Sequence, residues 1–169
     1  MKLIDILIES VNYQKAVEDL FKDTPELASI GTSEQYSDYL ATIFPSSKVK
    51  EIVYHSGRNK VEKFAERMFG TYFSYSPIEG TYGSVITKAL IDVKNPLVRP
   101  KPADSEEVKT VYDKEFRNYN NPSSPHDSSI EGSTVTKEGT QIKVKDPDQI
   151  HILGSKEDME KFKEYVKNK

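Results

Sequence analysis

The chain has 169 residues, of which 36% are hydrophobic and 30% charged, with a net charge of −3 and no cysteine. This length suits one domain that buries a core without covalent cross-links. The lack of cysteine excludes disulfides, zinc–thiolate sites and thiol catalysis, and the slight acidic surplus argues against nucleic acid as a partner. No stretch is long and apolar enough to span a membrane, and Asp5 and Glu9 interrupt the N-terminal apolar run, unlike in a signal peptide.

Residues 1–50 have the spacing of helices. Apolar residues recur at helical intervals until Asp23-Thr24-Pro25 ends the first run. Thr32 and Gln35 have the pattern of a capping box at the start of a second helix, which ends at Phe44-Pro45.

Strands are predicted from residue 50 onward, where β-branched and aromatic residues gather. The predicted strands are 52–54, 71–73, 84–93, 133–136, 141–144 and 149–153. The segment 84–93 carries apolar residues on both faces, which predicts a central strand. Residues 61–68 fit either a short helix or an irregular turn.

The segment 98–131 is poor in aliphatic residues and rich in Pro, Ser, Asn and charge, which predicts a long surface loop with a helix near 106–116. A loop of this length in a compact domain is usually functional or disordered. Ser155 is placed to cap a final helix. Helices, then strands, then one helix predict an α+β domain.

Two short segments carry the strongest functional signal. The segment 52–57 reads as a strand ending on His55 and a glycine turn, and 70–74 as a strand that carries Tyr72. If both lie at the mouth of one sheet, they suit a flat, hydroxyl-bearing ligand such as a nicotinamide nucleotide. From the residues alone, the favoured interpretation of His55 is a histidine whose hydrogen bonds are satisfied at a strand end. No metal site is expected, since the three histidines are far apart in the chain.

Several fragments, taken in order, resemble the ADP-ribosyltransferase superfamily. The resemblance covers Gly31 to Ser155 and is strongest to the His-Tyr-Glu branch, which includes diphtheria-toxin-like enzymes and poly(ADP-ribose) polymerases. Within it, the chain looks like the small domains of phage and mobile-element polyvalent proteins. The fragments are 31–36, 43–45, Val53-Tyr54-His55, Gly70-Thr71-Tyr72-Phe73-Ser74, Val93-Lys94-Asn95-Pro96-Leu97 and Asp146-Pro147-Asp148-Gln149-Ile150.

The resemblance implies a split pair of small antiparallel sheets, with N-terminal helices, a C-terminal helix and NAD held in the cleft. It divides the chain into a helical extension, 1–30, and a domain, 31–169, with the long loop 98–131. His55 matches the histidine that bonds the adenosine ribose, and Tyr72 the tyrosine that stacks on nicotinamide. Tyr82 is a candidate second ring, and Ser74 a candidate for bonding the amide or a ribose.

The sequence departs from the family pattern at two places. Ser56 stands where a glycine usually clamps the carboxamide, and Gly57 follows it. Gln141 stands where the family has its catalytic glutamate; a glutamine can hold a ribose hydroxyl but cannot act as a base. Glu138 in the preceding turn and Asp127 in the long loop are candidate replacements.

The resemblance predicts an NAD-dependent mono-ADP-ribosyltransferase, phage-encoded, that modifies a host or phage protein. The alternative is a weakly active or inactive module that binds NAD or serves a structural role. RNA 2′-phosphotransferase chemistry is a third reading, against which the net charge argues. The expected location is the cytoplasm of the infected cell or the phage particle, without membrane attachment.

Overall fold

The computed structural model describes residues 3–68, 70–78, 80, 82–100, 114, 118–119, 121, 123–132 and 139–169, with 3–12 and 99–100 by their backbone only. It confirms the α+β class. Its helices are α1 (Leu3–Asp23), α2 (Glu26–Ile30), α3 (Ser33–Leu40) and α5 (Lys156–Lys167), with the short 3₁₀ turn η1 (Pro147–Gln149). Its strands are β1 (Val53–Gly57), β2 (Thr71–Ser74), β3 (Val85–Ile91), β4 (Pro96–Pro100), β5 (Ser128–Gly132), β6 (Gln141–Val144) and β7 (Ile150–Ile152).

The seven strands form one hydrogen-bonded sheet in the order β4-β5-β6-β2-β1-β3-β7. All neighbours are antiparallel except β4 and β5, which are parallel. The resemblance implied two small sheets, whereas these strands are continuous. The link between β1 and β2 is narrow, however, because its register consists of the single pair Tyr54 and Ser74.

Side chains alternate between two faces of this sheet, which we name by one residue each. The His55 face carries Val53, His55, Phe73, Ile142 and Val144, and the Tyr72 face carries Tyr54, Tyr72, Ser74, Gln141 and Lys143. A buried apolar cluster lies on the His55 face, where Phe64 from the irregular segment after β1 packs against the strands.

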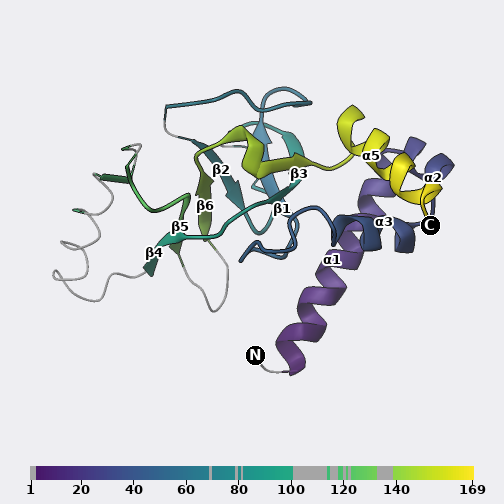
Figure 1. Cartoon of the computed structure of the whole chain (residues 1–169), viewed down its shortest axis with the longest axis horizontal. Helices are drawn as coiled ribbons and strands as arrows, with labels where there is room; N and C mark the ends of the chain where they lie inside the picture. The colour runs from purple at the N-terminus through teal and green to yellow at the C-terminus, as the bar shows by residue number, and fades with distance from the viewer. Residues whose placement is uncertain are drawn as a thin grey trace.

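The helices cover only one end of the Tyr72 face. Leu20 of α1, Tyr36 of α3 and Phe162 of α5 are buried together with Ile52 and Leu90, next to β1 and β3. In Figure 1 the helices accordingly gather beside β1 and β3, while β2, β6, β5 and β4 extend away from them. The Tyr72 face of β2 and β6 therefore lies beyond the helices.

The local signals of the helices are confirmed. Thr32 and Gln35 form the predicted capping box at the start of α3. Ser155 caps α5 by accepting a hydrogen bond from the Asp158 backbone N–H. None of the helices, in the part of the chain that is described, is long and apolar enough to cross a membrane.

The strand predictions have mixed outcomes. The segments near 52–54, 71–73, 84–93, 141–144 and 149–153 are strands, and β3 is internal, as predicted. Residues 61–68 are irregular rather than helical. The predicted strand 133–136 lies outside the described residues, as does most of the predicted helix 106–116.

One correction concerns the ends of the supposed loop 98–131. β4 and β5 occupy these ends and pair with each other over five residues, from Pro96 with Ser128 to Pro100 with Gly132. The prediction was wrong here because neither strand has a strong apolar pattern. Their pairing depends instead on partners distant in sequence.

Candidate functional site

The three residues on which the resemblance rests lie on three neighbouring strands. His55 is on β1, Tyr72 on β2 and Gln141 on β6, and these strands are adjacent in the order β6-β2-β1. Gln141 is directly opposite Ser74, and Ser74 is directly opposite Tyr54. The fold thus brings together positions that are as far as 86 residues apart in the printed sequence.

His55 and Tyr72 point to opposite faces of the sheet. The imidazole of His55 packs edge-on against Phe64, with ring centroids 4.9 Å apart, and lies 5.8 Å from the Phe73 ring. Its Nδ1 is 2.8 Å from the backbone oxygen of Tyr72. Since a carbonyl only accepts, Nδ1 carries the proton, and Nε2 of the neutral ring is left as an acceptor. In the neutral form of the ring, Nε2 can therefore accept a hydrogen bond from a ribose hydroxyl.

Tyr72 has a ring that is accessible to a ligand, since the residue is 47% exposed. The ring also has a cationic neighbour, because the Lys143 Nζ lies 5.7 Å from its centroid. Lys143 itself is only 2% exposed. Burial lowers the pKa of this lysine, the positive charge of Lys145 lowers it further, and the negative charge of Glu131 opposes both.

Ser56 and Ser74 form hydrogen bonds within the protein. The Ser56 hydroxyl donates to the backbone oxygen of Ile78 at 2.6 Å, and the Ser74 hydroxyl to that of Ser76 at 2.7 Å. Both hydrogen bonds hold the loop after β2 on the Tyr72 side of the sheet, so the hydroxyl of each serine positions this loop.

The same loop carries Tyr82 and closes tightly on β1. A Cβ added at Gly83 would lie 2.1 Å from the backbone oxygen of Gly57, so Gly83 allows a backbone contact that no larger residue at its position permits. Tyr82 is 59% exposed. The loop therefore holds a second accessible tyrosine near the strand ends, whereas Gly57 lies in a backbone contact.

Gln141 has a carboxylate neighbour that the sequence did not reveal. Glu131 on β5 is its register partner, and Ser74 on β2 is the partner on its other side. Of the two replacements suggested by sequence, Glu138 lies outside the described residues. Asp127 accepts hydrogen bonds from the backbone N–H groups of Lys94 and Asn95, at 2.8 and 3.0 Å. Its carboxylate therefore stabilises the turn before β4.

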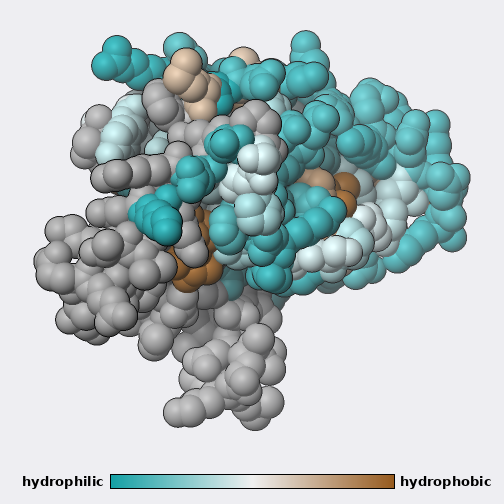
Figure 2. Space-filling model, turned by 60° about the vertical axis from the view of Figure 1, so that its left-hand side comes forward, coloured by the Kyte–Doolittle hydropathy of each residue, from teal (hydrophilic) through white to brown (hydrophobic). Residues whose placement is uncertain are grey.

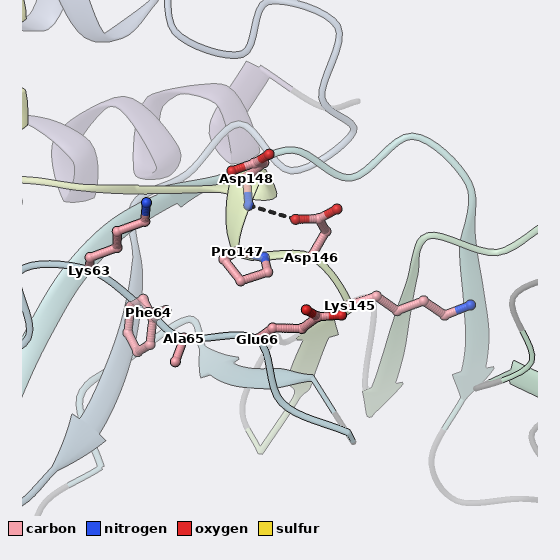
Figure 3. A pocket seen from close by; sticks show the side chains of 8 residues that line it. All are labelled: Lys63, Phe64, Ala65, Glu66, Lys145, Asp146, Pro147 and Asp148. Atoms are coloured by element: carbon pink, nitrogen blue, oxygen red, sulfur yellow. Dashed lines mark hydrogen bonds between the residues drawn. The ribbon is translucent and has the colours of Figure 1, made fainter.

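A cavity of about 630 Å³ lies elsewhere. Its lining residues are Lys63, Phe64, Ala65, Glu66, Lys145, Asp146, Pro147 and Asp148. Figure 3 shows the 63–66 segment on one side and η1 on the other, with the Lys145 side chain extending away. None of the sequence-predicted site residues lines it, although Phe64 also contacts His55. Within the described ranges, no group of His, Cys, Asp or Glu is arranged to hold a metal ion.

On the side drawn in Figure 2 the described surface is mostly hydrophilic, with small, separate hydrophobic areas. Large exposed hydrophobic side chains include Met68, Tyr72, Tyr82 and Val98.

Two residues of the candidate site, Lys143 and Glu131, were not predicted from the sequence. Strand alternation along 141–144 could have placed Lys143 on the side of Gln141, whereas only the β5–β6 register reveals Glu131.

No family model matches the sequence, and neither a curated protein nor a solved structure matches the chain.

Proposed function

We propose that this chain is an NAD-dependent mono-ADP-ribosyltransferase that modifies a protein acceptor, encoded by a phage or mobile element. The observation that carries the proposal is the placement of His55, Tyr72 and Gln141 on three adjacent strands. These positions were predicted from the sequence, and the sheet carries them on neighbouring strands, with Tyr72 and Gln141 on one face and His55 on the other.

In this proposal NAD lies at the seam between β1 and β2. The seam divides the sheet into two parts, β4-β5-β6-β2 and β1-β3-β7, joined by the pair Tyr54 and Ser74. Because His55 and Tyr72 project to opposite faces, a single ligand contacts both only where the sheet opens. The narrow register at β1 and β2 is the feature that favours this location.

Each predicted residue then has a defined task. The exposed Tyr72 ring stacks on nicotinamide, and Tyr82 supplies a second ring from the tethered loop. His55 Nε2 accepts a hydrogen bond from a ribose hydroxyl, and the Gln141 amide holds the hydroxyl of the other ribose. Ser56 and Ser74 act indirectly, by fixing the loop that carries Tyr82.

A second candidate function is a module that keeps this fold without turnover, as an NAD-binding or structural part. Gln141 favours it, because the neutral amide cannot serve as a base. The packing of the His55 ring against Phe64 and Phe73 also favours it, since these contacts give the histidine a role in the core.

Calorimetry with NAD, combined with transfer of labelled ADP-ribose to proteins of a bacterial lysate, separates these functions. Tyr72→Ala is expected to weaken NAD binding about tenfold, the loss of a stacking contact of roughly 1–2 kcal/mol. Glu160→Ala, at an exposed position of α5, is the control and is expected to bind as the wild type does. Binding without transfer would support the second function, and absence of binding would refute both NAD-dependent proposals.

A further inference from the structure

A carboxylate lies beside Gln141 on the same face of the sheet. Ser74, Gln141 and Glu131 are register partners across β2, β6 and β5, and so form a row perpendicular to the strands. Directly opposite residues of antiparallel strands have Cβ atoms about 4.5–5.5 Å apart. The Cβ atom of Glu131 therefore lies close to that of Gln141, so both side chains can contact the same group of a ligand.

The approach of β5 to β6 is fixed at this position by Gly132. Gly132 has a φ of +142°, and a Cβ added to it would lie 2.5 Å from the Thr140 Cα. The chain next to Glu131 thus passes the chain next to Gln141 at a distance that only glycine allows. Because Glu131 belongs to a paired strand, its position relative to Gln141 is defined by the sheet.

A lysine on the Tyr72 face lies close enough to Glu131 for their charges to interact. The buried Lys143 is two residues after Gln141 on β6, with its Nζ near the Tyr72 ring. The negative charge of Glu131 acts on this lysine and raises its pKa, in opposition to burial. The charges of Glu131 and Lys143 therefore interact beside the Tyr72 ring.

We propose that Glu131 is the catalytic carboxylate of this site and acts in place of the glutamate that Gln141 replaces. This inference rests on the proposed function. The bond between the anomeric carbon of the ribose and the nicotinamide nitrogen breaks, and its electron pair leaves with nicotinamide. The nucleophile of the acceptor protein forms a bond to that carbon, and its proton passes to the Glu131 carboxylate, while Gln141 holds the ribose hydroxyl.

The test measures nicotinamide release and NAD affinity for the wild type and three variants. Glu131→Gln removes the charge while keeping the size, and is expected to lower kcat about 10²–10⁴-fold with the Kd for NAD changed less than about threefold. Adding Gln141→Glu to Glu131→Gln returns a carboxylate to the same row and is expected to restore most of kcat. Glu160→Gln, on the exposed side of α5, is the control and is expected to keep the wild-type rate.

Five outcomes are informative. A loss confined to kcat, with rescue by Gln141→Glu, supports the inference. Normal kcat in Glu131→Gln overturns it while the transferase function stands, as does a loss that follows weaker NAD binding. A wild type that binds NAD without turnover also overturns Glu131 as the catalytic group. A wild type that does not bind NAD refutes the proposed function itself.

Discussion

Nε2 of His151 lies 2.6 Å from Oδ1 of Asp158 in the interior of the protein, where the two residues are 6% and 0% exposed. The same carboxylate accepts hydrogen bonds from the hydroxyls of Tyr36 and Tyr39, at 2.6 and 3.0 Å, and from the Gly154 backbone N–H at 2.8 Å. Asp158 thereby joins β7, α3 and α5 through one side chain.

Replacing this carboxylate is expected to be among the most destabilising single changes. Asp158→Ala leaves two hydroxyls, an imidazole and a backbone N–H without their acceptor, a loss of about 3–5 kcal/mol. Urea unfolding followed by circular dichroism measures it. Glu160→Ala, two residues later on the exposed side of α5, is the control, expected to change stability by less than about 0.5 kcal/mol. Similar midpoints for the two variants would contradict the structural role of Asp158.

The buried tyrosines predict a loss of stability in alkali. Burial raises the pKa of Tyr13, Tyr36 and Tyr39 well above the usual value, and the negative charge of Asp158 raises it further for the last two. The unfolded chain releases these protons near pH ~10, whereas the folded chain retains them. The contribution of these tyrosines to stability is therefore constant below about pH 10 and falls above it, by up to about 1.4 kcal/mol per pH unit for each tyrosine.

A spectroscopic titration of phenolate, run beside circular dichroism, checks this expectation. At least these three of the ten tyrosines should ionise only as the fold is lost. Ionisation of all ten near pH ~10 in a protein that remains folded would show that the cluster is open to solvent.

The close contact at Gly132 predicts a position-specific glycine effect. Gly132→Ala places a Cβ 2.5 Å from the Thr140 Cα and is expected to destabilise the protein by about 2–4 kcal/mol. Gly139→Ala is the matched control, because Gly139 also has a positive φ, +69°, but among the described residues no atom lies within 4 Å of an added Cβ. It is expected to cost about 1 kcal/mol from backbone strain alone. Thermal unfolding of the two variants distinguishes crowding from strain, and equal losses would argue against a crowded β5–β6 contact.

Ser47 predicts a further loss where the turn after α3 meets the end of β3. Its buried hydroxyl donates to the Ile91 oxygen at 2.7 Å and accepts from the N–H groups of Val49 and Val93, at 3.2 and 3.0 Å. Ser47→Ala leaves these groups unsatisfied and is expected to cost about 1–3 kcal/mol in denaturant unfolding. The exposed Ser46→Ala should be nearly neutral, and a comparable loss there would point to the backbone of the turn instead.

The elements that could be predicted are those with local signals. The capping box of Thr32 and Gln35, and the N-cap at Ser155, are sequence patterns that act within one turn, so α3 and α5 were accessible from sequence. The alternation along β3 was equally visible. β5 was not, because its five residues, Ser128 to Gly132, include a single aliphatic side chain and owe their conformation to β4 and β6.

The candidate site shows the same division. Placing His55, Tyr72 and Gln141 on strands needed only local patterns. The face of the sheet to which each side chain points could be determined only from the register between β1 and β2. This register aligns Tyr54 with Ser74, so the His55 imidazole and the Tyr72 ring lie on opposite faces. Along the chain, the acidic residue nearest to Gln141 is Glu138. In the sheet, the acidic residue directly opposite Gln141 is Glu131.

The parallel pairing of β4 and β5 sets a lower limit on how far this chain can be shortened. Parallel neighbours cannot be joined by a tight turn, and their connection needs about a dozen residues or more. A connection of at least that length is therefore a topological necessity, and the connecting segment also supplies Asp127, which accepts from the N–H groups of Lys94 and Asn95, and the buried Tyr119. An engineered deletion that joins Pro100 closely to Ser128 would therefore lose both strands.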